Sequence, residues 1–183
     1  MNVRETKLPG VLVIEPRLFH DQRGYFSETF QESRYAEHGV CGPFVQDNVS
    51  YSTKGVLRGL HYQWPDPQAK LITVLSGEVL DVAVDIHRDS PTYGQWISET
   101  LSSDNLKQLY VPRGYAHGFY VFSDSAVVLY KVDAYYNPTG AKSLLWNDPE
   151  IGVEWPSATP ILAKQDAEAP PLNELTIQFS PLS

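Results

Sequence analysis

Short apolar runs, each ending within a few residues at Gly, Pro, Asn or Asp, are the dominant pattern along the chain. Runs of this length between turn-forming residues predict β-strands. The alternation is clearest where Leu80, Val82 and Val84 share one face of a strand and Asp81 and Asp85 share the other. We therefore expect one face of this strand to pack in the core and the other face to be polar.

The same signals divide most of the chain into short strands. The predicted strands cover residues 11–15, 25–29, 44–51, 56–62, 70–76, 78–87, 94–101, 106–111, 117–122, 126–133 and 143–146. Helical signals are scarce, and we expect only two helical turns over residues 31–38 and tight turns at 104–106 and 148–150. Many short strands without crossover helices predict an all-β fold of antiparallel strands, a double sheet or jelly roll, rather than a Rossmann arrangement.

The length of 183 residues is sufficient for one sizeable core, so we predict a single domain over residues 1–183. From about residue 157 the chain becomes rich in Pro and Ala and loses its strand periodicity. We expect this part to run as an ordered tail over the surface of the domain.

Charge and composition exclude several classes of partner. Fourteen basic against 22 acidic residues give a net charge of −8, which argues against nucleic acid and requires a local basic pocket for any anionic ligand. The single cysteine, Cys41, cannot form an intramolecular disulfide, which favours a reducing, cytoplasmic location. The chain has no apolar run of membrane-spanning length, so no membrane association is expected.

The histidines do not have the spacing of a metal site. The chain has five, His20, His38, His61, His87 and His117, and none of them forms an HxH or HExxH pattern. We therefore predict no metal site. A lone histidine on a strand is usually a hydrogen-bonded structural residue, and we interpret His38 and His87 in this way.

His61 lies in a more suggestive context, Val-Leu-Arg-Gly-Leu-His at residues 56–61. Strict strand alternation puts Arg58 and His61 on opposite faces, whereas a bulge at Gly59 brings them together. The residues alone leave both arrangements open.

Several short motifs combine aromatic or aliphatic residues with charged or amide residues. They are DQRGYF (21–26), FVQDN (44–48), VLRGLH (56–61), DVAVD (81–85), SPTYGQW (90–96), PRGYAHGF (112–119), LYK (129–131) and LWNDP (145–149). Their order, spacing and residue types closely resemble those of the dTDP-4-dehydrorhamnose 3,5-epimerases, from about Lys7 to Pro171.

This resemblance implies a metal-independent, cupin-type jelly roll, usually a homodimer, that acts on a nucleotide-linked 4-keto-6-deoxy sugar without a cofactor. It implies that His61 removes a proton with Asp166 as its partner, and that Tyr130 is the acid on the opposite face of the sugar ring. It places Lys70 at the C4 oxygen. These residue types suit the chemistry, because the C4 ketone acidifies the hydrogens on C3 and C5, and the resulting enolate needs a cation.

The resemblance also implies a nucleotide-sugar site. The matching positions are Arg23, Glu28, Gln46, Asp47, Asn48, Arg58 and His117, with Tyr136 as the residue that stacks on the base. Arginines suit a diphosphate because their paired N–H groups make charge-assisted hydrogen bonds. An acidic chain can therefore still bind an anion in a local pocket.

The sequence departs from the family pattern at two positions. Ala141 stands where many members have a glutamate, and Gln165 stands where a lysine usually precedes the C-terminal aspartate, although Lys164 is adjacent. Both departures bear on nucleotide affinity or on the sugar accepted, rather than on proton transfer.

Without the resemblance, simpler interpretations apply to several of these residues. Asp81 and Asp85 are then either a solvated or hydrogen-bonded strand face or a support for the site. Arg23 and Glu28 are then an ordinary surface pair. Tyr130 is then a strand aromatic that packs its ring and exposes its hydroxyl.

The predicted function is an isomerase that converts dTDP-4-dehydro-6-deoxy-D-glucose to dTDP-4-dehydro-L-rhamnose and so feeds L-rhamnose into surface polysaccharide. One alternative is a single-centre epimerase of a natural-product deoxysugar pathway. Another is a non-catalytic cupin that binds a nucleotide sugar. The presence of His61, Lys70, Tyr130 and Asp166 together argues against the binding module, because binding alone needs neither an acid nor a base.

Overall fold

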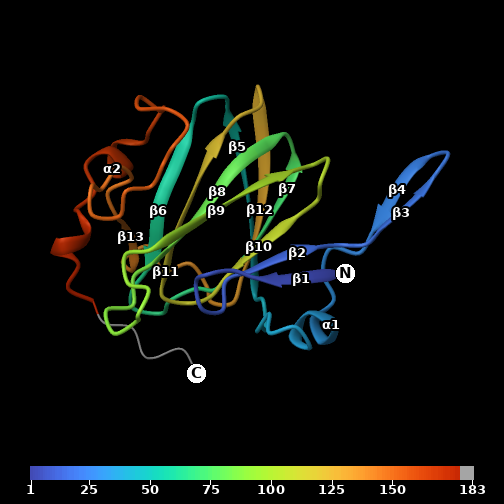
Figure 1. The fold of residues 1–183 in the computed structure, drawn as a ribbon, viewed down its shortest axis with the longest axis horizontal. Coiled ribbons are helices and arrows are strands. Elements are labelled where there is room, and N and C mark those ends of the chain that lie inside the picture. Colours follow the sequence, from blue (N-terminus) through green and yellow to red (C-terminus); the bar gives the residue numbers. More distant parts are fainter. Residues whose placement is uncertain (178–183) are drawn as a thin grey trace.

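In the computed structural model, which describes residues 1–177, two antiparallel sheets pack face to face (Figure 1). The larger sheet contains, in spatial order, β1 (Asn2–Glu5), β2 (Leu12–Glu15), β10 (Gln108–Val111), β7 (Lys70–Ser76), β12 (Ser125–Val132) and β5 (Gln46–Thr53). The smaller sheet contains β13 (Ala141–Ser143), β6 (Leu57–Gln63), β11 (Tyr115–Val121), β8 (Glu78–Asp85) and β9 (Trp96–Ser102).

The remaining elements are small. A separate hairpin, β3 (Leu18–Asp21) with β4 (Gly24–Ser27), extends away from the two sheets (Figure 1). The described helices are α1 (Glu32–Ala36), α2 (Lys164–Ala167) and the 3₁₀ turn η1 (Leu172–Glu174). None of the helices within residues 1–177 is long and apolar enough to cross a membrane.

The predicted all-β fold of antiparallel strands with few short helices is confirmed. The sequence pattern missed β1 and β3, because their residues, NVRE and LFHD, are mostly exposed and lack a clear run of alternating or apolar residues. The last predicted strand, at 143–146, lies two residues earlier, at 141–143. The predicted helix at 31–38 is shorter, over Glu32–Ala36.

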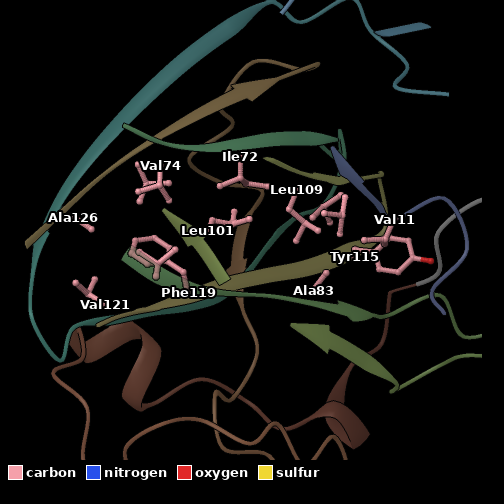
Figure 2. Packing of buried hydrophobic residues seen from close by; sticks show 14 of the residues in the cluster. Val11, Ile72, Val74, Ala83, Leu101, Leu109, Tyr115, Phe119, Val121 and Ala126 are labelled. Atoms are coloured by element: carbon pink, nitrogen blue, oxygen red, sulfur yellow. The ribbon is translucent and has the colours of Figure 1, made fainter. Parts of the chain in front are cut away.

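The main core fills the space between the sheets (Figure 2). Ile72 and Val74 of β7 project from the larger sheet, and Ala83 of β8 and Phe119 of β11 project from the smaller one. All four are at most 1% exposed. Burial of apolar area on this scale is the dominant force that holds two sheets together.

A second apolar cluster covers the outer face of the smaller sheet. Val82 and Val84 of β8 pack there with Leu144, Ile151 and Leu172 of the C-terminal part of the chain. The expected surface tail begins near residue 157, and its last residues, 178–183, lie outside the described residues.

Because of this cover, β8 is buried on both faces, and the solvated interpretation of Asp81 and Asp85 is wrong. Both carboxylates are fully buried. They are tolerated there because they are hydrogen-bonded, Asp81 by His117 and Asp85 by the His87 backbone and by the hydroxyl of Thr92. The alternating pattern grouped the residues of β8 correctly by face, but the face with Asp81 and Asp85 points into the core between the sheets, and the face with Val82 and Val84 packs under the C-terminal part of the chain.

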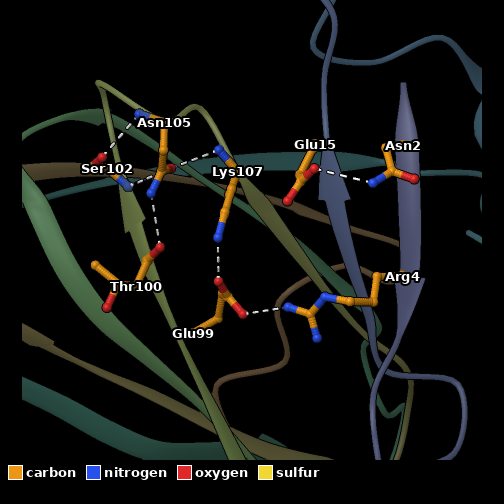
Figure 3. Close-up of polar contacts among 8 residues, drawn as sticks. All are labelled: Asn2, Arg4, Glu15, Glu99, Thr100, Ser102, Asn105 and Lys107. Atoms are coloured by element: carbon orange, nitrogen blue, oxygen red, sulfur yellow. Dashed lines mark hydrogen bonds and ion pairs between the residues drawn. The ribbon is translucent and has the colours of Figure 1, made fainter.

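Polar contacts join two edge strands of the sandwich (Figure 3). Arg4 of β1 donates to Glu99 of β9 at 2.7 Å, and Lys107 also donates to Glu99 at 2.7 Å. Glu99 is only 16% exposed, so this pair of cations neutralises a largely buried carboxylate. The contact links the edges of the two sheets.

β6 has an irregularity that positions the site. Arg58 pairs with Phe119 and His61 pairs with His117, so three steps along β6 oppose two along β11. Of the two arrangements that the sequence left open, the bulge at Gly59 is therefore the one present, and strict alternation between Arg58 and His61 is broken. Gly59 has a φ of +134°, and a Cβ built on it would lie 2.6 Å from the Cα of Gly118. Only glycine allows this close crossing of β6 and β11.

We predict that Gly59→Ala destabilises the fold by about 2–4 kcal/mol, because a methyl group would collide with the backbone of β11. Gly24→Ala is the matched control, since Gly24 has a similar φ of +128° but an added Cβ would meet nothing within 4 Å. Thermal and urea unfolding measure both variants. Equal losses in the two variants would show that backbone conformation, not the crossing, requires glycine.

Candidate active site

A cavity of about 310 Å³ lies between the sheets. It is lined by Asn48, His61, Tyr62, Gln63, Gln68, Lys70, Tyr130, Val132, Tyr136, Ala141, Lys142 and Gln165. The larger sheet contributes residues of β5, β7 and β12, and the smaller sheet contributes residues of β6 and β13. The lining includes two lysines and a histidine but no carboxylate, in a chain of net charge −8. The local basic pocket that an anionic ligand requires is therefore present.

His61 reaches the cavity from β6 and is paired with a buried aspartate. Its Nε2 lies 2.7 Å from Oδ1 of Asp166, whose side chain is only 4% exposed, whereas the His61 side chain is 41% exposed. Burial alone raises the pKa of Asp166, but hydrogen bonds from His61, Gly59 N–H and Ser143 outweigh it and lower that pKa below its usual range. An ionised aspartate holds a histidine in one tautomer and stabilises its protonated form. His61 is therefore arranged as a base, with Nδ1 as the nitrogen that remains for a substrate.

The short helix α2 brings Asp166 beneath β6. The preceding segment is attached to β6 through the parallel bridge between Val56 and Ile161 and the hydrogen bond from Leu57 N–H to the Ile161 carbonyl, 3.0 Å long. Asp166 then donates its own N–H to Ala163 at the start of the turn. The backbone N–H of Gly59 donates to Asp166 Oδ2 at 3.2 Å. The bulge thus supplies both the histidine and one donor to its partner.

Lys70 enters the cavity from β7 of the opposite sheet. Its ammonium donates to the carbonyl oxygen of His61 at 3.2 Å. Burial lowers the pKa of Lys70 from 10.5 to about 8, and the nearby Asp81 charge opposes this shift. At neutral pH the side chain is therefore mostly cationic and poorly solvated, which suits it to stabilise an anionic oxygen.

Tyr130 projects from β12 of the larger sheet. Its hydroxyl lies 3.1 Å from Ser50 Oγ, and its ring lies edge-on to His117 with centroids 6.1 Å apart. Burial raises the pKa of Tyr130 far above its usual value, so the phenol keeps its proton at neutral pH. Its protonated hydroxyl belongs to the cavity wall on the sheet opposite the strand that carries His61.

A second histidine–aspartate pair lies behind this wall. His117 Nε2 is 2.9 Å from Asp81 Oδ1, and both side chains are at most 4% exposed. Burial lowers the pKa of His117 more than the Asp81 charge raises it, so this histidine is neutral. Within residues 1–177 the other oxygen, Asp81 Oδ2, has no hydrogen-bond partner. Its charge attracts the ammonium of Lys70.

The structure brings together some of the predicted nucleotide-binding residues. Asn48 and Tyr136 line the cavity. Gln46 joins them, because its side chain donates to Asn48 at 2.8 Å and accepts from the Tyr136 N–H at 2.9 Å. Arg58 is not among the lining residues. It donates to Ser52 at 2.8 Å, and its charge acts on the phenol of Tyr130.

Asp47, Arg23 and Glu28 likewise do not line the cavity of this chain. Asp47 forms an ion pair with Lys131 at 2.9 Å on β5 and β12. Arg23 is 85% exposed on the β3–β4 hairpin and is paired with Asp21, and Glu28 is paired with Arg34. Arg23 and Glu28 therefore do not form the surface pair considered from the sequence.

Sequence reasoning missed four polar residues of the site: Gln63, Gln68, Lys142 and Ser143. Gln63 and Gln68 donate to the backbone of Tyr135 and Ala134, respectively, and so hold the loop that carries Tyr136. No motif singled these residues out. Alternation on β6 places Gln63 on the same face as His61, and that was the available signal.

Both departures from the family pattern lie in the cavity wall, at Ala141 and Gln165. No group of three or more His, Cys, Asp or Glu side chains within residues 1–177 is arranged to hold a metal ion.

An antiparallel jelly roll whose two sheets bring a histidine and a tyrosine to one cavity is the architecture of the cupin-type sugar epimerases, and comparison with known proteins gives the family. The family model for dTDP-4-dehydrorhamnose 3,5-epimerase matches residues 5–174. A Legionella pneumophila epimerase solved with dTDP-4-keto-L-rhamnose has 47% identity and a TM-score of 0.92, covering 95% of this chain and 94% of that one. The chain belongs to the dTDP-4-dehydrorhamnose 3,5-epimerase family, and the predicted cupin-type fold is confirmed.

Two relatives carry the same description. The Shigella flexneri dTDP-4-dehydrorhamnose 3,5-epimerase is 49% identical over 91% of this chain and 93% of its own length. The Neisseria gonorrhoeae dTDP-4-dehydrorhamnose 3,5-epimerase is 50% identical over 91% of this chain. The match covers only 51% of the Neisseria protein, so this chain spans about half the length of that relative.

We predict that Lys70→Met raises the free energy of unfolding at pH 7 by about 1–2 kcal/mol, because it removes a charge that burial disfavours. The folded pKa of about 8 lies below the ordinary 10.5, so the unfolded chain binds more protons between these values. The stability of the unmodified protein must therefore rise relative to Lys70→Met as the pH increases from 8 to 10.5. Urea unfolding across this range measures the difference. A constant difference would show that Lys70 has its ordinary pKa in the folded protein.

Proposed function

We propose that this chain epimerises dTDP-4-dehydro-6-deoxy-D-glucose at C3 and C5 to give dTDP-4-dehydro-L-rhamnose, which supplies L-rhamnose for surface polysaccharide. The observation that carries the proposal is the position of His61 on β6 and Tyr130 on β12, strands of opposing sheets that line one cavity. Inversion of a carbon requires removal of a proton from one face and delivery to the other. A cavity with a base and an acid on facing walls meets that requirement.

The proposed steps use only side chains of this chain. His61 removes the proton from a carbon next to the ketone, and Asp166 stabilises the imidazolium that forms. The electron pair moves onto the C4 oxygen, and the Lys70 ammonium stabilises the resulting enolate. The enolate collapses as Tyr130 protonates the same carbon from the other face, and the two groups exchange protons with solvent before the second centre reacts.

The nucleotide is proposed to extend from the sugar towards Tyr136 and Arg58. The exposed ring of Tyr136 supports stacking on the base, and the guanidinium of Arg58 suits the diphosphate. Lys142 adds a second positive charge at the cavity wall. Asn48 and Gln46 present amide groups for the base or the sugar hydroxyls.

The proposal includes a homodimer in the cytoplasm. Val49 and Tyr51 are each 63% exposed on β5, an edge strand of the larger sheet, and such an apolar edge suits pairing with a second copy. Arg23 and Glu28 lie away from the cavity of their own chain, so any part they take in nucleotide binding requires a partner subunit. The single cysteine suits a reducing compartment.

The test is to incubate the protein with the 4-keto substrate in heavy water and to follow deuterium at C3 and C5 by NMR. Deuterium at both carbons, with formation of the L-rhamno product, supports the proposal. Deuterium at one carbon would support a single-centre epimerase instead. Deuterium at neither, with the nucleotide sugar bound, would identify a binding module.

His61→Ala must abolish deuterium exchange at both C3 and C5, and near-normal exchange in that variant would exclude His61 as the base.

We predict that Tyr130→Phe separates exchange from inversion. The variant retains His61 and Lys70, so deuterium still enters, but product formation falls about 100-fold because the acid on the other face is missing. Phe keeps the ring that packs beside His117 and Phe119. Tyr120→Phe is a control that removes a phenol from β11, outside the residues that line the cavity. Normal inversion by Tyr130→Phe would contradict the assigned role.

A further inference from the structure

Asp166 is held by more than its contact with His61. Oδ1 accepts from His61 Nε2 at 2.7 Å and from Ser143 Oγ at 3.3 Å, and Oδ2 accepts from Gly59 N–H at 3.2 Å. Ser143 is 7% exposed and lies on β13, where it is the register partner of His61. The hydroxyl of Ser143 therefore contacts the carboxylate that the histidine depends on, without lining the cavity itself.

The direction of the Ser143 hydrogen bond follows from its other neighbour. The amide Nε2 of Gln165, on α2, donates to Ser143 Oγ at 3.1 Å. An amide NH₂ group cannot accept a hydrogen bond, so the single hydroxyl proton of Ser143 is directed to Asp166. Gln165 therefore donates to Ser143, and Ser143 donates to Oδ1 of Asp166, the same oxygen that His61 Nε2 contacts.

We infer that Ser143 and Gln165 are positioning residues for the base: Gln165 orients the Ser143 hydroxyl, the hydroxyl fixes the Asp166 carboxylate, and the carboxylate holds His61 with Nδ1 towards the substrate. This inference rests on the proposed function. It also explains how Gln165 serves at a position where the family often has lysine, because both side chains end in N–H donors. A fixed carboxylate keeps the histidine in its productive geometry and lowers the cost of forming the imidazolium.

The kinetic test uses Ser143→Ala, Gln165→Met and the double variant. Ser143→Ala is expected to reduce kcat about 10-fold with KM within about 2-fold, because a hydrogen bond to a charged group is lost away from the substrate. Gln165→Met is expected to reduce kcat about 3-fold, because the hydroxyl remains but is no longer directed. The double variant must be no slower than Ser143→Ala, since Gln165 acts only through Ser143. Glu168→Gln, an exposed position one residue beyond α2, is the control with unchanged kcat.

Multiplicative losses in the double variant, or a loss confined to KM for Gln165→Met, would overturn the inference and assign Gln165 to direct contact with the substrate.

The acid limb of the pH profile of kcat/KM gives a second readout, because loss of the Ser143 donor makes the Asp166 carboxylate more basic and moves that limb to higher pH. Lys70 on β7, Tyr130 on β12 and Lys142 on β13 share the cavity with His61, and His117 on β11 is its register partner. No variant alters these titratable groups. An unmoved acid limb in Ser143→Ala would contradict the assigned role.

The inference can fail separately from the proposed function. In substrate-free protein, nitrogen-15 NMR of the imidazole shows whether the proton of neutral His61 is on Nε2, as the contact with Asp166 requires. The unmodified protein and Glu168→Gln should show this single tautomer, and Ser143→Ala should show a mixture. An identical tautomer in all variants would reject the positioning role even if the protein proved to be an active epimerase.

Discussion

The close crossing of Gly59 and Gly118 is the constraint on which the site depends. β6 contains one extra residue at this point, which turns His61 into the space between the sheets. The backbone N–H of Gly59 is free to donate to Asp166 at 3.2 Å, and Asp166 in turn contacts His61 at 2.7 Å. A single local irregularity thus places the histidine, supplies a donor to its carboxylate partner and brings β6 and β11 together. A regular β6 strand would form all of its backbone hydrogen bonds with its neighbours, but it would not bring His61 and the Gly59 N–H to Asp166.

Charge in the interior is divided between the cavity and the layers behind it. The cavity wall carries Lys70 and Lys142 and no carboxylate, while Asp81 and Asp166 lie behind it and are each at most 3% exposed. Each aspartate contacts a histidine, and Asp81 also attracts the Lys70 ammonium. This arrangement keeps a cation in a poorly solvated place without putting a negative charge where an anionic substrate would bind. The overall charge of −8 therefore does not describe the pocket.

The apolar pattern was sufficient to predict the antiparallel sandwich, because most strands alternate or form short buried runs between turns. It failed at β1 and β3, whose short and mostly exposed segments form strands by pairing with a neighbouring strand. It also grouped the residues of β8 by face, but it could not show that the Asp81 face points between the sheets, since His117, which hydrogen-bonds to Asp81, lies 36 residues away in sequence.

The candidate site was predicted through ordered motifs rather than through residue chemistry alone. The resemblance that those motifs carry singled out His61, Lys70 and Tyr130, which the structure brings to one cavity, and Asp166, which it pairs with His61. They did not identify Ser143, because its role arises from contacts made only when β13 and α2 pack beside β6. Tertiary contacts of this kind leave no local signal in the sequence.

The most direct test of the account is a crystal structure of the protein with dTDP-L-rhamnose, which lacks the ketone and does not turn over. The account predicts that the hexose lies in the cavity with His61 Nδ1 against one face and the Tyr130 hydroxyl against the other, and that Lys70 Nζ approaches the C4 oxygen. A hexose bound outside this cavity, or with both groups on the same face of its ring, would contradict it.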